Sequence, residues 1–73
     1  MTNGLKQRFI DLLEQDAAQA HKSAQAWKEL QEQGAARLED AQGKTIATAA
    51  DMVTRFTEKE KELRAFIAKI KAA

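Results

Sequence analysis

Apolar residues in the second half of the chain recur at strict steps of three and four residues. The repeat consists of Ile46, Ala49, Val53, Phe56, Glu60, Leu63, Ile67 and Ile70, with Glu60 as its single polar member. Such spacing places every member on one stripe of a helix, which is the pattern of coiled coils. The stripe predicts a helix over residues 46–71.

A second repeat of the same kind begins at Ile10 and is built mainly from alanine. Its members are Ile10, Leu13, Ala17, Ala20, Ala24 and Trp27, and the phase continues more weakly through Gln31, Gly34, Leu38 and Ala41. Small residues let two helix backbones approach closely, while larger residues on the facing helix fill the remaining space. We therefore expect a first helix over about residues 3–41 that lies along the second one.

The two repeats differ in phase by one residue, so something must interrupt the helix between Ala41 and Ile46. Gly43 can adopt the left-handed conformation that ends a helix, and Thr45 or Thr48 can cap the next one. This predicts a turn at about residues 42–45. Two alternatives remain open, namely a break or kink at Gly34 and a third short helix that starts from the capping-box pattern of residues 57–60.

Length and composition limit how such a chain becomes stable. With 73 residues it forms one domain, 1–73, and it has no cysteine for a disulfide and no proline. Domains of this size bury a small core, so self-association is the expected source of further stability. The predicted fold class is all-α: an antiparallel, coiled-coil-like two-helix hairpin that dimerises into a four-helix arrangement.

Large apolar residues outside the two stripes predict an interaction surface. A turn at Gly43 sets residue 16 opposite residue 70, so residues 3–14 extend past the second helix and must be covered by a second copy or by another protein. Met52 and Phe66 widen the apolar face of the second helix. The candidate interface residues, for the dimer or for a partner, are Leu5, Phe9, Leu12, Met52, Phe66 and Ile70.

Polar residues give little sign of catalysis. His21 has no second metal ligand on its helical face, and Ser23, two residues further on, points in another direction. The carboxylates alternate with Lys or Gln, and the three glycines are isolated rather than grouped in a phosphate-binding loop. We expect no enzyme activity, no metal and no cofactor. Glu60 either sets the register through Lys28 or a lysine of a second copy, or faces solvent.

Charge and hydropathy narrow the partner classes. The net charge is +1, and stretches such as "TEKEKELR" alternate in sign, which disfavours nucleic acid as a partner. No apolar run is long enough for a membrane span, and the opening "MTNGLKQRF" lacks the charged-then-apolar order of a signal peptide. A cytoplasmic location is expected.

From "MTNGLKQRFIDLLEQDA" to "FIAKIKAA", the chain resembles small helical accessory proteins that temperate phages make early in infection, above all the phage anti-activators of quorum sensing. The likeness is one of size, two-helix organisation and general sequence character. It implies a hairpin dimer in the host cytoplasm that binds a host transcription regulator and blocks its binding to DNA. The expected function is therefore binding and inhibition of a partner protein; the alternative is a structural coiled-coil subunit without inhibitory activity.

Overall fold

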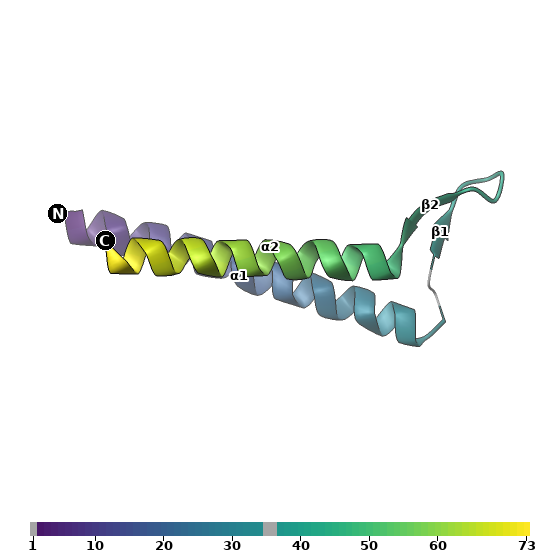
Figure 1. Ribbon diagram of the computed structural model, residues 1–73, viewed down its shortest axis with the longest axis horizontal. Coiled ribbons are helices and arrows are strands. Elements are labelled where there is room, and N and C mark those ends of the chain that lie inside the picture. The colour runs from purple at the N-terminus through teal and green to yellow at the C-terminus, as the bar shows by residue number, and fades with distance from the viewer. Residues whose placement is uncertain (1, 35–36) are drawn as a thin grey trace.

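Two long antiparallel helices joined by a β-hairpin make up the chain in the computed structural model (Figure 1). The structure describes residues 2–34 and 37–73, with side chains from residue 4 onward. Helix α1 spans Thr2–Glu32, strand β1 Arg37–Glu39, strand β2 Thr45–Thr48 and helix α2 Ala49–Ala72. The two-helix hairpin is confirmed, but the small sheet shows that the all-α prediction was incomplete.

Helix α1 ends at Glu32, well before the predicted boundary near residue 41. Gly34 has a φ of 89°, and its backbone N–H donates to the carbonyl of Gln31 at 3.1 Å. A positive φ is costly for residues with a Cβ, so glycine ends the helix here. The break thus lies at the position that sequence analysis kept as the alternative; residues 35–36 of the predicted helix lie outside the described residues.

The predicted turn at Gly43 exists, but it joins two strands instead of two helices. The Asp40 carboxylate accepts the backbone N–H groups of Gln42 and Lys44, each at 2.9 Å, and the N–H of Gly43 donates to the Asp40 carbonyl at 3.0 Å. Asp at the first position and Gly at the fourth are typical of this turn, and Gly43 has a φ of 80°. The sequence Asp40 to Gly43 therefore closes a β-hairpin.

Antiparallel pairing in the hairpin joins Arg37 to Thr48 and Leu38 to Ala47, and then skips one residue so that Glu39 pairs with Thr45. Ile46 is the skipped residue, and its side chain is 64% exposed. Its predicted place on the buried stripe of the second helix was therefore wrong. The strand holds Ile46 outside the helix, which begins three residues later at Ala49.

Thr48 caps the start of α2. It is one of the two threonines that the sequence predicted for this role. Its side-chain oxygen accepts the backbone N–H of Asp51 at 3.1 Å, which satisfies one of the free donors at the helix start. The helix then continues without interruption to Ala72. Helix α2 therefore runs through residues 57–60, and no separate third helix starts there.

The core is a narrow seam between the two helices. Among the residues with described side chains, the buried hydrophobic ones are Ile10, Ala17, Ala20, Ala24, Ala49 and Ile67. All of them belong to the two predicted stripes, whereas the weaker continuation through Gln31, Gly34, Leu38 and Ala41 is exposed. The alanine seam is confirmed up to Ala24, with Trp27 half-buried beyond it.

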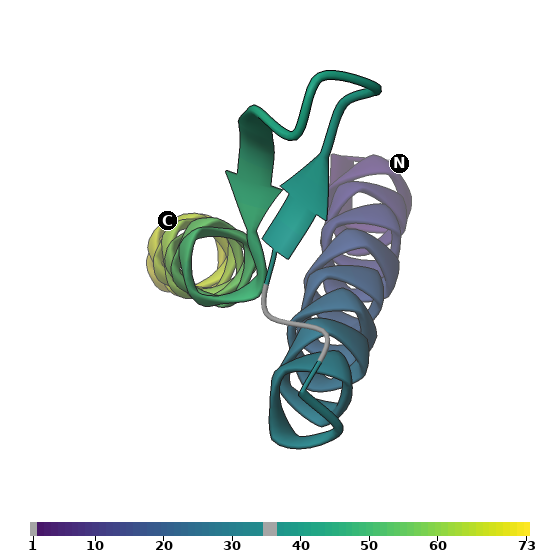
Figure 2. The ribbon, with the colours of Figure 1, turned by 90° about the vertical axis from the view of Figure 1, so that its right-hand side faces the viewer.

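The two helices form a single layer, as the end view in Figure 2 shows. The chain measures 56 × 21 × 14 Å along its principal axes, so its shortest dimension is little more than one helix diameter. Many side chains outside the seam are therefore exposed to solvent. Over residues 2–34 and 37–73, neither helix has a stretch long and apolar enough to cross a membrane.

The helix register is close to the predicted one near the chain ends. Glu14 and Lys71 approach each other, with Oε1 3.3 Å from Nζ, where sequence analysis set residue 16 opposite residue 70. Helix α1 begins beyond the end of α2 (Figure 1). However, Leu5 and Phe9 line a hollow together with Ile70 and Ala73 of the other helix end, and Ile10 is buried. The predicted overhang of residues 3–14 was therefore wrong for most of its length.

Candidate functional site

The two long edges of the helix pair differ in chemistry. One edge carries Glu14, His21, Glu60, Arg64 and Lys71, and we call it the ion-pair edge. Lys71 contacts Glu14 across the helices near the chain ends, and His21 contacts Glu60 further along. Polar side chains therefore bridge the two helices along the ion-pair edge.

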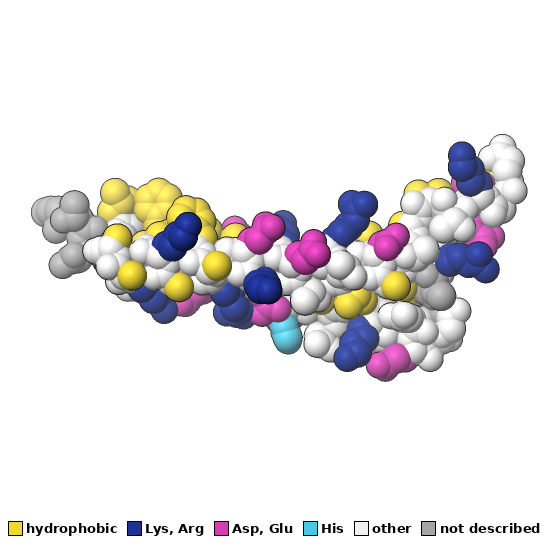
Figure 3. Space-filling model, in the orientation of Figure 1, with side chains coloured by type: hydrophobic (Ala, Val, Ile, Leu, Met, Phe, Trp, Pro, Cys, Tyr) yellow, Lys and Arg dark blue, Asp and Glu magenta, His cyan; other side chains and the backbone are white. Residues whose placement is uncertain are grey.

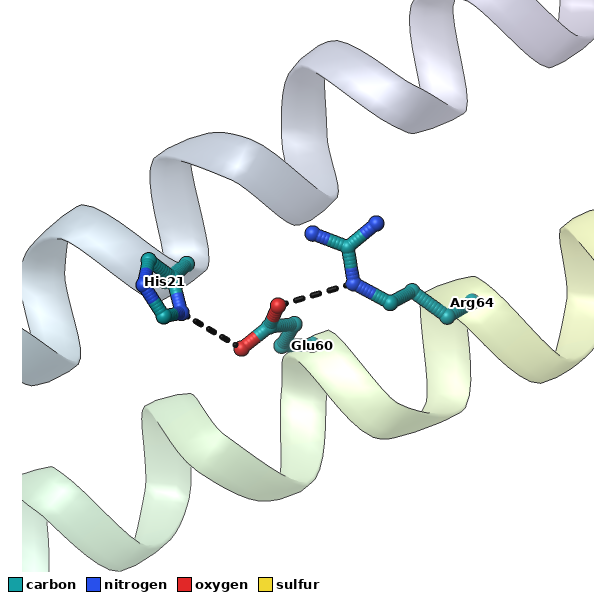
Figure 4. Close-up of polar contacts among 3 residues, drawn as sticks. All are labelled: His21, Glu60 and Arg64. Atoms are coloured by element: carbon teal, nitrogen blue, oxygen red, sulfur yellow. Dashed lines mark hydrogen bonds and ion pairs between the residues drawn. The ribbon is translucent and has the colours of Figure 1, made fainter.

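Glu60 is the centre of the ion-pair edge (Figure 4). The His21 Nδ1 atom donates to Oε1 at 3.1 Å, and the Arg64 Nε–H donates to Oε2 at 2.8 Å. The glutamate side chain is 19% exposed and accepts from both helices. Glu60 therefore links the two helices at the one polar position of the α2 stripe. Its partners are His21 and Arg64, whereas the sequence suggested Lys28 as its partner within the chain.

The hydrogen bond from Arg64, followed by the one from His21, holds the pKa of the Glu60 carboxyl below its ordinary value of 4.5. Both hydrogen bonds favour the charged carboxylate over the neutral carboxylic acid, because the neutral acid is a weaker hydrogen-bond acceptor. Burial acts in the opposite direction and is the weaker influence. Glu60 is thus held as a carboxylate in the folded chain at neutral pH.

The opposite edge is apolar where the chain ends meet. We call Leu5, Phe9, Leu12, Phe66 and Ile70 together the apolar edge. Leu5, Phe9, Phe66 and Ile70, with Lys6 and Ala73, line an open hollow of about 440 Å³ between the two helices. Figure 3 shows hydrophobic side chains gathered at the upper margin near the chain ends, while the histidine lies at the lower margin.

Residues of the apolar edge are unusually exposed for their size. Leu5 is 61% exposed, Phe9 55%, Leu12 51% and Phe66 53%, whereas Ile70 is half-buried. Steps of four and three residues put Leu5, Phe9 and Leu12 on one face of α1. Single exposed apolar residues are ordinary on protein surfaces, whereas these residues form a contiguous exposed group.

Five of the six predicted interface residues thus lie together at one end of the helix pair. The exception is Met52, which is half-buried in the first turn of α2, at the hairpin end of the molecule. The prediction grouped it with Phe66 because both flank the same stripe. Distance along α2 separates them in the structure.

Among the described residues, three large exposed hydrophobic ones were not among the predicted interface residues. Leu30 is 40% exposed near the end of α1, and Leu38 and Ile46 are 55% and 64% exposed on the hairpin. The turn signature from Asp40 to Gly43 was the available signal for the hairpin, since it would have removed Leu38 and Ile46 from their helical stripes. Exposed apolar residues therefore also occur towards the hairpin end of the molecule, on two separate elements.

The described residues offer little for catalysis. Two residues apart on α1, His21 and Ser23 project in different directions, and His21 is engaged with Glu60. No group of three His, Cys, Asp or Glu side chains able to hold a metal occurs within the described ranges. The chemistry available at the apolar edge is burial of hydrophobic surface.

Comparisons with known protein families, with curated proteins and with solved structures gave no match to this chain.

Proposed function

We propose that this chain is a non-enzymatic protein-interaction module that binds a partner protein through the apolar edge and inhibits it. The observation that carries the proposal is the group of half-exposed Leu and Phe side chains around the hollow between the helix ends. Covering such side chains contributes about 25 cal/mol per Å² of apolar surface. Among the residues that line the hollow, Lys6 is the one with a charged side chain, so the surface that a partner would cover is mainly apolar.

The shape of the surface favours a helical segment as the bound element. An open hollow flanked by two helices accepts the apolar face of an amphipathic helix, whose large side chains fill it. Lys6 at the rim of the hollow favours a carboxylate on the segment that binds. The partner segment is therefore an amphipathic helix with an acidic residue beside its apolar face.

The narrower proposal is that the chain acts as a phage anti-activator in the host cytoplasm. It rests on the resemblance in size, helical organisation and sequence character described above. In this proposal the partner is a host transcription regulator, and a chain bound to it prevents access to DNA. The mechanism is steric or competitive and needs no residue with a catalytic role.

The test is affinity capture from bacterial host lysate with the wild-type chain, Phe9→Glu and the control Ala65→Glu. Ala65 is exposed on α2 and lies on the face away from the seam, so the control adds the same charge without touching the apolar edge. We expect wild type and control to capture a DNA-binding regulator and to lower its DNA binding in an electrophoretic shift, and Phe9→Glu to lose both effects. Equal capture by all three chains would overturn the proposal.

A structural coiled-coil subunit without inhibitory activity is the second candidate. It is favoured by one observation, the presence of exposed apolar residues at both ends of an elongated molecule. Head-to-tail contact between unlike ends produces open filaments, whereas a closed dimer stops growing. Filaments in electron micrographs of the purified chain, with no captured regulator, would favour this candidate.

A further inference from the structure

We propose that a second copy of this chain docks antiparallel along the apolar edge, with the helix ends of each copy against the hairpin end of the other. This proposal rests on the proposed function, because it concerns the same surface. A second copy would cover that surface when no partner protein is bound. The proposal is carried by three observations: the order of residues along the edge, their charges, and the apolar area they leave open.

The faces that form the apolar edge continue along both helices. On α1 the face of Leu5, Phe9 and Leu12 continues at helical steps of three or four through Asp16, Gln19, Ser23, Ala26 and Leu30. On α2 the face of Phe66 continues in the other direction through Glu62, Lys59, Arg55 and Met52. Each face is thus apolar at both ends and polar in the middle.

Charges in that polar middle are arranged in a definite order. Asp16 and Glu62 lie nearer the chain ends, while Lys59 and Arg55 lie nearer the hairpin. All four are exposed, and within residues 4–34 and 37–73 none of them takes part in an ion pair. The acidic and basic halves are available for a second molecule.

An antiparallel second copy matches this order. A two-fold axis between Lys59 and Glu62 brings Glu62 of each copy opposite Lys59 of the other, and Asp16 towards Arg55. A parallel copy would instead set each acidic residue against its own equivalent. Opposed like charges disfavour that arrangement, so charge complementarity selects the antiparallel one.

The same alignment covers the exposed apolar residues at both ends. The hairpin rises from the margin on which the apolar edge lies (Figures 1 and 3), and it carries the exposed Leu38 and Ile46. In the antiparallel pair, each hairpin therefore lies over Leu5 and Phe9 of the other copy. The hairpin thereby covers the open hollow between the helix ends of the other copy.

The available area distinguishes this dimer from one made by the helix ends alone. A half-exposed Phe, Leu or Ile leaves on the order of 100 Å² open. Leu5, Phe9, Leu12 and Phe66 would give roughly 800 Å² over two copies, below the range of about 1,200 to 2,000 Å² for stable interfaces. Adding Leu30, Leu38 and Ile46 raises the total to roughly 1,400 Å², within that range.

The dimer and the partner exclude each other because both occupy the apolar edge. Conditions that favour the dimer therefore lower the concentration of chains able to bind a partner. Dimerisation would thus protect the apolar surface and regulate its use at the same time.

The experiment is sedimentation equilibrium of the purified full chain as wild type, Lys59→Glu, Glu62→Lys and the double variant with both changes. Glu58→Lys is the matched control, since Glu58 is exposed on the outward face of α2. Circular dichroism verifies that each variant is helical before its association is measured.

We expect wild type and Glu58→Lys to form the same dimer. Each single change at residues 59 and 62 should weaken it roughly tenfold, because the pair occurs twice in a two-fold dimer. The double variant restores the opposite charges and should return to within about threefold of wild type. A wild type that stays monomeric, or a double variant as weak as the singles combined, would overturn the inference and leave partner capture as a separate question.

Discussion

Alanine is the residue that decides how closely the two helices lie. Ala17 is fully buried in the seam, and Ala20, Ala24 and Ala49 are nearly so. Their methyl groups leave little room between the backbones, and a larger side chain would have to displace the facing helix. We therefore expect larger side chains at these alanine positions to destabilise the packing of the two helices.

Ala17→Leu should destabilise the fold by about 1 to 3 kcal/mol, because it inserts several carbon atoms into a filled position. Ala18→Leu is the matched control, since Ala18 is exposed beside it on the same helix. Urea denaturation followed by circular dichroism measures both variants. Equal stability of the two leucine variants would contradict the close approach of the helices at Ala17.

Glu60 makes the stability depend on pH in a definite direction. Its pKa is lowered from 4.5 in the folded chain, so its stabilising contribution is complete above about that pH and is lost as the pH falls through the lower, folded value. Glu60→Gln should therefore lose less stability on acidification than wild type does. Thermal unfolding between about pH 6 and pH 3 checks this, with Glu58→Gln as a control that should follow wild type.

At the level of secondary structure, helical spacing predicted the two helices, whereas the connection had to be read from turn residues, which showed the breaks at Gly34 and Gly43 but not the strands between them. The stripes of Ile10 to Ala24 and Ala49 to Ile70 show helical spacing, because each turn of one helix has to place an apolar residue against the other helix. No such spacing governs residues 33–34 and 37–48, where backbone hydrogen bonds around Asp40 and two glycines with positive φ set the structure. Helical phase, extended through this segment, assigned Leu38 and Ile46 to seams that they do not join.

Gly43 gives the hairpin turn a backbone conformation that residues with a Cβ rarely adopt. With a φ of 80° it holds a conformation that costs other residues about 1 to 2 kcal/mol, although open space surrounds it. Gly43→Ala should therefore lower the free energy of unfolding by about 1 kcal/mol. Gly4→Ala is the contrast, because Gly4 lies in α1 without a positive φ and should become slightly more stable.

Chemical denaturation of the two glycine variants separates backbone strain from crowding. Neither position has a neighbouring atom within 4 Å of an added Cβ, so contacts cannot account for a difference in sign. A Gly43→Ala variant as stable as wild type would mean that the hairpin is not an integral part of the cooperative fold.

At the scale of the whole molecule, a single layer of two helices cannot cover its own apolar residues. Polar contacts close one long edge, and the other leaves Leu5, Phe9 and Phe66 at least half exposed. The sequence was sufficient to predict these exposed residues, because they lie beside the stripes and exceed what one facing helix can bury. It was not sufficient to place them on one edge, which depends on the register that the hairpin imposes.

Light scattering coupled to gel filtration at several concentrations would show whether a second copy of the chain covers the apolar edge. We expect a mass of twice the 8.1 kDa of one chain at high concentration. Dilution, or the substitution Phe9→Glu, should shift that mass towards the monomer. A well-folded monomer at every concentration would contradict self-coverage of the edge, and large polydisperse assemblies would contradict a closed dimer.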